Sequence, residues 1–198
     1  MSRPAVLALH YQNDVLHPDG RIRVGLAAED PARQRVLDAA AALLGGARQR
    51  GWPIIHVRVA YRPDYADLIQ NAPILKAVAA IGAVQEGSWG AEFYEPLAPK
   101  AESPDEYVVK HSRINAFYGT PLDILLRALK AERLLIAGVA THSVVESTVR
   151  HAVDCGFEVT VAADACASAS PAAHHASLDS MRLIAEIGDV RSALETLQ

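Results

Sequence analysis

The sequence has few cysteines and lacks any long apolar run. Its 198 residues include two cysteines, Cys155 and Cys166. Two cysteines are too few for a disulfide scaffold, and their spacing is not that of metal ligands. The apolar run near the N-terminus ends after about seven residues, whereas a membrane span needs about 20 and a signal peptide needs a longer run with a cleavage site. We therefore expect a cytoplasmic protein with reduced thiols and no membrane segment.

The chain also lacks a surplus of basic residues. It contains 19 lysines and arginines against 23 aspartates and glutamates, a net charge of −4. A protein dedicated to phosphate backbones normally carries a basic surplus, so we expect no nucleic-acid partner. Hydrophobic residues make up 51% of the chain and charged residues 21%, which excludes intrinsic disorder. Because no linker, repeat or low-complexity tract interrupts the sequence, we predict one domain over residues 1–198.

Short apolar runs alternate with amphipathic segments along the chain. The runs have the length of strands, and several are apolar on both faces, which is typical of central strands in a parallel sheet. They are Ala5–Tyr11, Pro53–Val59, Glu106–His111, Arg133–Val139 and Phe157–Asp164. Helices are predicted over Arg33–Arg50, from Thr120, over Thr141–Cys155 and after Ser170. This alternation predicts an α/β fold, a doubly wound parallel sheet with helices on both faces.

Polar side chains or tight turns follow three of the predicted strands. His10 follows the first, Lys110 stands at the end of the third, and residues 138–142 follow the fourth and turn directly into a helix. Ligands of doubly wound sheets bind beyond the carboxyl ends of the strands, so these groups form the candidate site. Backbone N–H groups at the start of a helix can hold an oxyanion, and a lysine would add positive charge. We expect a small-molecule ligand there.

Each of these residues also has an ordinary structural explanation. Lys110 could be a solvated lysine at the edge of the sheet, His10 a core histidine, and Thr141 the N-cap of its helix. The functional interpretation depends on the topology, because parallel strands bring their carboxyl ends to one edge of the sheet.

The chain resembles the isochorismatase-like (cysteine hydrolase) superfamily in four segments, which are LALHYQND, EYVVKHSRINAFYGTPLD, LLIAGVATHSVVEST and VTVAADACAS. The resemblance covers nearly the whole sequence. It implies a three-layer, Rossmann-like sheet of six parallel strands, a homodimer or homotetramer, and hydrolysis of a small amide or enol ether. It also implies a cis peptide bond between Val139 and Ala140 that turns N–H groups towards a substrate oxygen.

The superfamily's catalytic aspartate, lysine and cysteine are only partly matched. The lysine corresponds to Lys110, whereas His10 stands at the aspartate position and Val144 at the cysteine position. A valine cannot form a thioester, and loss of a nucleophile typically costs about 10⁶ in turnover. We therefore predict a degenerate catalytic triad and exclude the cysteine amidase mechanism.

Replacements for the missing nucleophile are few. Ser143 lies one helical position from the nucleophile position, and one step turns a side chain by about 100°. Cys155 lies at the far end of the helix, whereas a role for Cys166 near a strand end stays open beside ordinary burial. The polar segment Asp14–Asp19 lacks the later histidine that a nicotinamidase-type metal site needs, so we expect no metal and no cofactor.

Two functional hypotheses follow. In the first, the chain hydrolyses a small amide, carbonyl or enol-ether metabolite without a cysteine. His10, kept neutral by the charge of Lys110, handles protons, and Lys110 stabilises negative charge. The predicted oxyanion turn is Val139, Ala140, Thr141 and His142, and the predicted pocket walls are Tyr11, Gln12, Trp89, Phe117 and Tyr118. In the second hypothesis, the chain is a catalytically inactive relative that binds a small carboxylate or carbonyl ligand.

Overall fold

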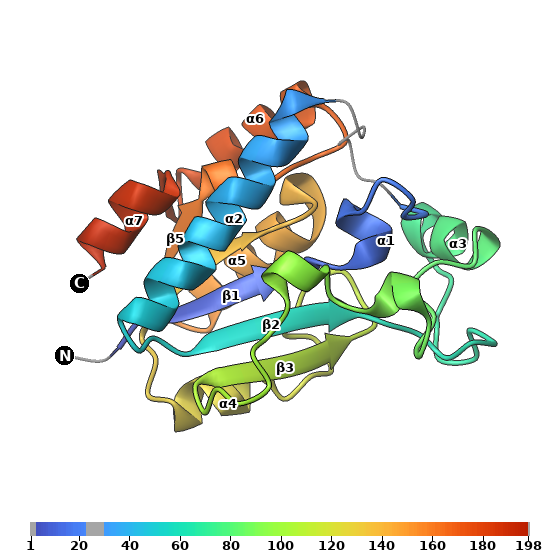
Figure 1. Cartoon of the computed structure of the whole chain (residues 1–198), viewed down its shortest axis with the longest axis horizontal. Helices are drawn as coiled ribbons and strands as arrows, with labels where there is room; N and C mark the ends of the chain where they lie inside the picture. The colour runs from blue at the N-terminus through green and yellow to red at the C-terminus, as the bar shows by residue number, and fades with distance from the viewer. Residues whose placement is uncertain (1–2, 23–29, 198) are drawn as a thin grey trace.

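A computed structural model describes residues 3–22 and 30–197, and its centre is a parallel sheet (Figure 1). The strands in these residues are β1 (Ala5–Leu9), β2 (Ile54–Val59), β3 (Glu106–His111), β4 (Arg133–Gly138), β5 (Glu158–Ala162) and β6 (Glu186–Gly188). All are parallel to their neighbours, in the order β3-β2-β1-β4-β5-β6. The predicted doubly wound α/β sheet is confirmed.

Helices cover both faces of this sheet. They are α1 (Asn13–Leu16), α2 (Pro31–Gln49), α3 (Pro73–Ala80), α4 (Leu122–Ala128), α5 (Glu146–Asp154), α6 (Pro171–Met181) and α7 (Val190–Thr196). Shorter turns are the 3-10 segments Trp89–Ala91, Glu95–Leu97 and Ala163–Ala165 and the π-helical turn Thr141–Val145. α2 contacts α7, and α5 contacts α6. Figure 1 shows α2 in front of the sheet, α4 behind β3, and α1 and α3 beyond the carboxyl ends of β1 and β2.

α2 shows why a helix forms where the sequence predicts one. The Asp30 carboxylate accepts a hydrogen bond from the Ala32 N–H at 2.8 Å, and Pro31 occupies the first helical position. Gly51, with φ of +63°, follows the end of the helix. The buried face repeats at helical spacing through Val36, Leu37, Ala40, Leu43, Leu44 and Ala47. The helix therefore packs one apolar stripe on the sheet.

The strands differ in burial according to their place in the sheet. Every residue of β1 is buried, as expected for a central strand. In β3, at the edge, Val109 and His111 are buried whereas Val108 and Lys110 are exposed. Successive side chains of a strand point to opposite faces, so Lys110 and His111 cannot serve the same site.

The ends of β1 and β4 meet where the connections leave the sheet in opposite directions, which is the usual ligand position in such folds. The close approach of the two strands requires Gly138, because a Cβ atom there would lie 2.3 Å from the Leu9 carbonyl oxygen. The next peptide bond, Val139–Ala140, is cis, as the resemblance implied. The turn after β4 therefore lies beside the end of β1.

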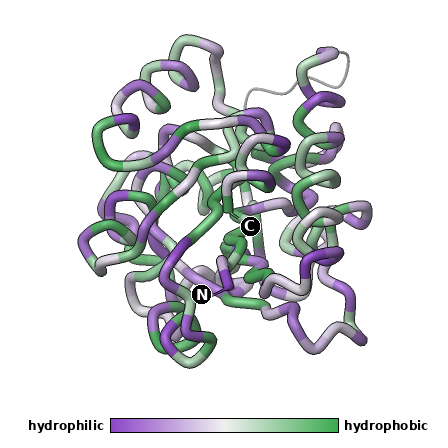
Figure 2. Tube along the Cα trace, turned by 90° about the vertical axis from the view of Figure 1, so that its left-hand side faces the viewer, coloured by the Kyte–Doolittle hydropathy of each residue, from purple (hydrophilic) through white to green (hydrophobic). Residues whose placement is uncertain are grey.

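The core lies between the sheet and its helices. Figure 2 shows apolar residues concentrated in the interior strands and hydrophilic residues on the outer turns. No helix within residues 3–22 and 30–197 is long and apolar enough to cross a membrane. The sequence analysis did not locate α1, α3, α7 or β6, which are all short elements.

Candidate functional site

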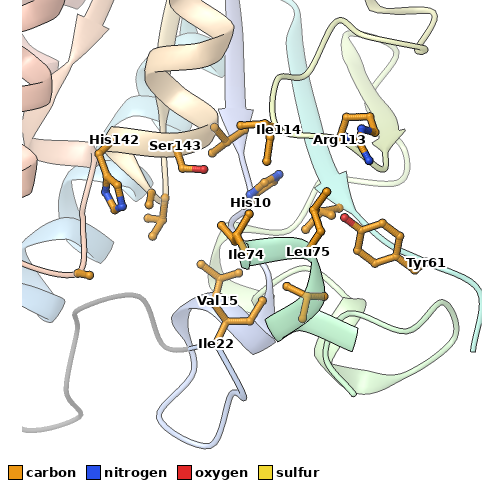
Figure 3. A pocket seen from close by; sticks show the side chains of 16 residues that line it. His10, Val15, Ile22, Tyr61, Ile74, Leu75, Arg113, Ile114, His142 and Ser143 are labelled. Carbon is orange, nitrogen blue, oxygen red and sulfur yellow. The ribbon is translucent and has the colours of Figure 1, made fainter. Parts of the chain in front are cut away.

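A cavity of about 280 Å³ lies beyond the carboxyl ends of β1 and β4. Its lining is mainly apolar, and α3 contributes Ile74, Leu75 and Val78 (Figure 3). The polar lining side chains are those of His10, Tyr61, Arg113, His142 and Ser143. An apolar cavity with a few polar groups at the switch point of the sheet is typical of a small-molecule site.

His10 is the first residue after β1 and adopts a left-handed backbone conformation, with φ of +59°. Its Nε2 atom is in direct contact with Nε2 of His111, the last residue of β3. The ring centroids are 4.7 Å apart and tilted by 31°. Nδ1 of His111 lies 3.1 Å from the Asn115 carbonyl oxygen. Two imidazoles from different strands thus form a pair at the cavity.

Burial favours the neutral form of both rings. It lowers the pKa of His10 well below its usual value, the nearby His111 ring lowers it further, and a hydrogen bond to the Val139 backbone opposes both effects. Burial also lowers the pKa of His111 to about 4. A neutral His10 is what the sequence analysis expected, but the cause is burial and His111 rather than Lys110.

The predicted place of Lys110 in this site is wrong. Its ammonium lies 3.0 Å from Oε2 of Glu86, and its side chain is 40% exposed. Arg58 joins the same surface cluster, 3.6 Å from the other oxygen of Glu86. Lys110 does not line the cavity, because the alternation of β3 turns it away and turns His111 towards His10. The solvated edge lysine weighed in the sequence analysis is what the structure contains.

The turn after β4 does lie beside His10, as predicted. Val139, Ala140, His142 and Val144 all line the cavity. Of the four residues in the predicted oxyanion turn, Val139 and Thr141 use their N–H groups on the Leu9 and Ala167 carbonyls, at 3.1 and 2.7 Å. The His142 N–H lies 3.4 Å from Oγ of Ser168. The Ala140 N–H is the candidate donor among the four.

Two side-chain hydrogen bonds hold the same turn on the side of β5 and α6. Oγ1 of Thr141 lies 2.9 Å from Nδ1 of His174, and Nδ1 of His142 lies 2.8 Å from Oγ of Ser168. These bonds attach the turn to the segment after β5 and to α6.

Two adjacent side chains of this turn, Ser143 and Val144, line the cavity. The expectation that Ser143 turns away from the nucleophile position is wrong, because residues 141–145 form a wide π-helical turn rather than a regular α-helix. Figure 3 shows the Ser143 hydroxyl within the lining.

Neither thiol lines the cavity. Sγ of Cys166 is buried and lies 3.3 Å from the Ala162 carbonyl oxygen, and burial raises the pKa of this thiol to about 12. Cys155 lies at the C-terminal end of α5 and is partly exposed.

The predicted pocket walls lie elsewhere in the protein. Tyr11 is a core residue whose hydroxyl donates to the Ala165 carbonyl at 2.7 Å. The Trp89 side chain is half exposed, Phe117 stacks on His151 with centroids 5.0 Å apart, and Tyr118 borders a separate surface groove. None of these side chains lines the cavity.

Gln12 is likewise outside the cavity and ties three segments together. Its amide nitrogen donates to the carbonyls of Val59 and Ala91 at 2.9 and 2.8 Å, and its oxygen accepts from the Val59 N–H at 2.9 Å. It supports the cavity instead of lining it.

Metal ligands do not gather anywhere in the described part of the chain, which holds no group of three or more histidine, cysteine, aspartate or glutamate side chains suited to an ion. Asp14, the first acid of the segment considered for a metal, accepts hydrogen bonds from the Arg21 and Val84 N–H groups at 3.0 and 2.7 Å. Its role is to hold two loops.

The sequence analysis missed His111 and Arg113 as site residues. The signal for His111 was present in β3, where an edge strand with buried Val109 must also bury the residue two positions later. Arg113 follows β3 in a loop that no periodicity describes.

The fold and the cavity define a doubly wound α/β protein with a cavity at its switch point. The model of the isochorismatase domain matches residues 4–192. The chain belongs to the isochorismatase family.

Relatives span most of the chain. It is 32% identical over 162 residues to the isochorismatase family protein YecD of Escherichia coli O157:H7, covering 82% of this chain and 81% of YecD. It is 29% identical over 181 residues to a probable inactive nicotinamidase of Arabidopsis thaliana, covering 91% and 88%. An isochorismatase family protein from Desulfovibrio vulgaris has the same fold, with a TM-score of 0.86, 27% identity and 99% of each chain covered.

Proposed function

We propose that this protein hydrolyses a small metabolite with an amide, carbonyl or enol-ether group and does so without a cysteine nucleophile. The observation that carries the proposal is the contact of His10 with His111 at the cavity, beside the turn that follows β4. A neutral imidazole can accept a proton from water, and burial, which lowers the pKa of His10, keeps its ring neutral near pH 7.

In the proposed reaction, His10 takes a proton from a water molecule as the water oxygen attacks the substrate carbon. The Ala140 N–H is the candidate donor to the oxygen that becomes negative. Val144 fills the place of the family's thiol with an apolar group, so no covalent intermediate forms there. The bond between that carbon and the leaving group then breaks, and the proton taken up from water passes to the leaving group.

The size and lining of the cavity support a small substrate. A volume of about 280 Å³ is at the lower end of ligand sites, and most of the lining is apolar. Related proteins are a maleamate amidohydrolase of Pseudomonas putida, 26% identical, and ureidoacrylate amidohydrolases such as that of Acinetobacter baylyi, 31% identical over 115 residues. Small amides and ureides are therefore the first substrates to test.

The test is an assay of the purified protein with maleamate, ureidoacrylate, nicotinamide and isochorismate, with product detected by mass spectrometry. We expect turnover of at least one compound and its loss in His10→Asn. Lys110→Ala is the matched control, because Lys110 lies outside the cavity and its loss leaves turnover unchanged. Equal turnover in the wild type and His10→Asn would contradict the proposal.

A second candidate function is ligand binding without catalysis. Two observations favour it: Val144 faces the cavity, and the Arabidopsis relative is named a probable inactive nicotinamidase. The same panel separates the two functions. Binding of a compound, measured by calorimetry, without any product after long incubation supports the second function and rejects the first.

We also propose that the protein is a cytoplasmic homodimer or homotetramer. Large apolar side chains are exposed outside the cavity, including Tyr118, Ile124 and Leu183 at 66%, 74% and 90%. Light scattering on the purified protein tests the oligomeric state, and a monomeric mass at micromolar concentration would reject it.

A further inference from the structure

Arg113 is the one side chain with a permanent charge among the lining residues of the cavity that the structure describes. A guanidinium is not deprotonated in proteins, whereas the other titratable side chains there, those of His10, Tyr61 and His142, all have a neutral form. No aspartate or glutamate is among these described lining residues. The cavity therefore presents a positive charge to its ligand without a carboxylate of its own to balance it.

The hydrogen bonds of Arg113 hold its side chain in place without neutralising it. Nη1 donates to the Ile69 carbonyl at 3.0 Å, and Nη2 donates to Oδ1 of Asn71 at 2.9 Å. Both acceptors are uncharged oxygens, and within residues 3–22 and 30–197 they use two of the five N–H groups of the guanidinium. An arginine that is fixed in this way and retains N–H groups is preorganised to bind a carboxylate.

Tyr61 lies beside Arg113 and adds no negative charge to this wall. Its hydroxyl donates to the carbonyl of Ser112, the residue before Arg113, at 3.3 Å. Burial raises the pKa of Tyr61 to about 12, and the charge of Arg113 opposes this rise by more than the carboxylate of Asp67 adds to it. The hydroxyl is therefore uncharged near pH 7, and Arg113 dominates the charge in its surroundings.

Arg113 and the candidate reacting groups lie on different sides of the cavity. Figure 3 shows Arg113 and Tyr61 on one side, Ser143 on the other and His10 between them. The sheet order gives the same separation, because Arg113 follows β3, which is two strands away from β1 and three from β4. Neighbouring strands lie about 4.8 Å apart, so the chain leaves β3 about 10 Å from the end of β1. A ligand that contacts both sides must carry different groups at its two ends.

We propose that Arg113 binds a carboxylate of the ligand and thereby selects acidic substrates whose scissile group lies at the other end, towards His10 and the Ala140 N–H. The inference rests on the proposed function for the reacting end, whereas the carboxylate site depends on the charge and position of Arg113. Arg113 is a specificity-determining residue and takes no part in proton transfer. The apolar side chains that α3 contributes to the lining, among them Leu75 and Val78, suit the short carbon chain between the two ends.

A purely structural role for Arg113 leads to a different expectation. If Arg113 only held residues 69–71, its replacement would weaken the binding of acidic and neutral ligands alike. Arg62 offers a matched control, because it is adjacent to Tyr61 but its Nη2 pairs with the Asp64 carboxylate at 2.9 Å, and it is not among the lining residues. Arg62→Gln removes the same charge from the neighbourhood without touching the cavity.

The first test compares acids with their neutral amides on the wild-type protein. Maleamate and maleamide, and succinamate and succinamide, are titrated calorimetrically, and kcat/KM replaces the affinity wherever product forms. We expect the acid of at least one pair to bind at least about tenfold more tightly than its amide, the usual effect of a hydrogen bond to a charged group. This preference should shrink as salt rises from about 0.05 M to 0.5 M, because salt screens the attraction. Equal affinities within both pairs, or no binding of either acid, would overturn the inference.

The second test assigns the preference to Arg113. Arg113→Gln should lower the affinity for the preferred acid by about 10- to 100-fold and leave its neutral amide within about threefold. Arg113→Lys keeps the charge but loses the planar fork, so it should recover part of the loss. Arg62→Gln should change neither affinity. Equal losses for the acid and its amide in Arg113→Gln would overturn the assignment.

These measurements separate this inference from the proposed hydrolysis. Tight binding of an acid that depends on Arg113, without any product, supports the inference and rejects the hydrolysis. Turnover without a preference for the acid of either pair supports the hydrolysis and rejects the inference.

Discussion

Two histidines at the sheet, His56 on β2 and His10 after β1, each contact a residue of β3, and these partners differ. Nε2 of His56 on β2 lies 2.9 Å from Oε2 of Glu106 on β3, and the same carboxylate binds Nε of Arg48 at 2.9 Å and the Lys100 N–H at 3.0 Å. His10 instead faces another imidazole and a cavity. In the first group Arg48 balances the charge of Glu106, and we call this the closed group. The second group borders the cavity, and no carboxylate is among the lining residues that the structure describes.

This difference distinguishes a histidine that stabilises the fold from one that is available for proton transfer. Burial lowers the pKa of both rings, but Glu106 opposes the effect at His56. Burial acts to raise the pKa of Glu106, yet the bonds from Arg48, Lys100 and His56 lower it to about 2. A buried imidazole beside a satisfied carboxylate stabilises the fold, and one beside an empty cavity is available for proton transfer.

Exchange of each histidine for asparagine gives the largest expected contrast. His10→Asn should lower kcat/KM by about 10² to 10⁴, the usual contribution of a general base, with little change in stability. His56→Asn should leave kcat/KM within about threefold and lower the free energy of unfolding by about 2 kcal/mol, because buried polar partners lose a bond. Steady-state kinetics and urea denaturation measure both. Similar changes of kcat/KM and of the free energy of unfolding in the two variants would contradict the distinction between the two histidines.

Neutralising Glu106 tests the closed group directly. Glu106→Gln should lower the free energy of unfolding by about 3 kcal/mol, since it leaves Arg48 and His56 without the charge that they share. Glu86→Gln is the matched control, because Glu86 lies in an exposed cluster and its loss should not measurably change stability. Chemical denaturation at pH 7 compares them. Equal losses of stability in Glu106→Gln and Glu86→Gln would mean that burial of the Glu106 carboxylate does not contribute to stability.

The two groups should also respond to different ranges of pH. The pKa of His111 is lower in the folded protein, at about 4, than its usual 6.5, so the unfolded chain binds more protons and stability falls as the pH drops from about 6.5 to 4. Glu106, with its pKa near 2 instead of 4.5, contributes stability that is lost as the pH falls from about 4.5 to 2. Denaturation midpoints across pH measure both ranges.

Glu106→Gln provides the control for this pH dependence. It should remove the lower of the two ranges and leave the upper one in place. If the wild type lost stability only below pH 4.5, the upper range would be absent. The two histidines would then bind protons as readily in the folded protein as in the unfolded chain, against the prediction.

The smallest effect concerns the thiols, which lie outside both groups. Iodoacetamide should modify Cys155 well before Cys166, because burial protects Cys166 and raises its pKa to about 12. Turnover should change less than about twofold when Cys155 is fully labelled, as mass spectrometry and assay can show. Rapid labelling of Cys166 with loss of turnover would place a thiol at the chemistry.

The sequence predicted the parts of the fold that follow periodicity. The apolar runs gave the five longer strands, and the turn at 138–142 gave the place of the site and, through the resemblance, its cis peptide bond. The error at Lys110 came from matching the family's lysine to this residue without applying the alternation of β3.

The cavity walls were not predictable in the same way. α3 and the loop of Arg113 come from segments with no strong pattern, and they reach the cavity only through the tertiary fold. The aromatic residues predicted as pocket walls, such as Tyr11 and Phe117, pack in the hydrophobic core instead. Composition shows which side chains suit a ligand, but long-range packing decides which of them reach it.

The position of α3 has a consequence for how substrate range can change. Gln12 ties the end of β1 to the end of β2 and to the turn at Ala91 through three hydrogen bonds, so that side tolerates little variation. The opposite wall includes α3, where Ile74 is 49% exposed and Leu75 and Val78 also line the cavity. Substitutions on this short helix can change the volume of the cavity without replacing His10 or His111. α3 is therefore the element to vary when substrate selectivity is redesigned.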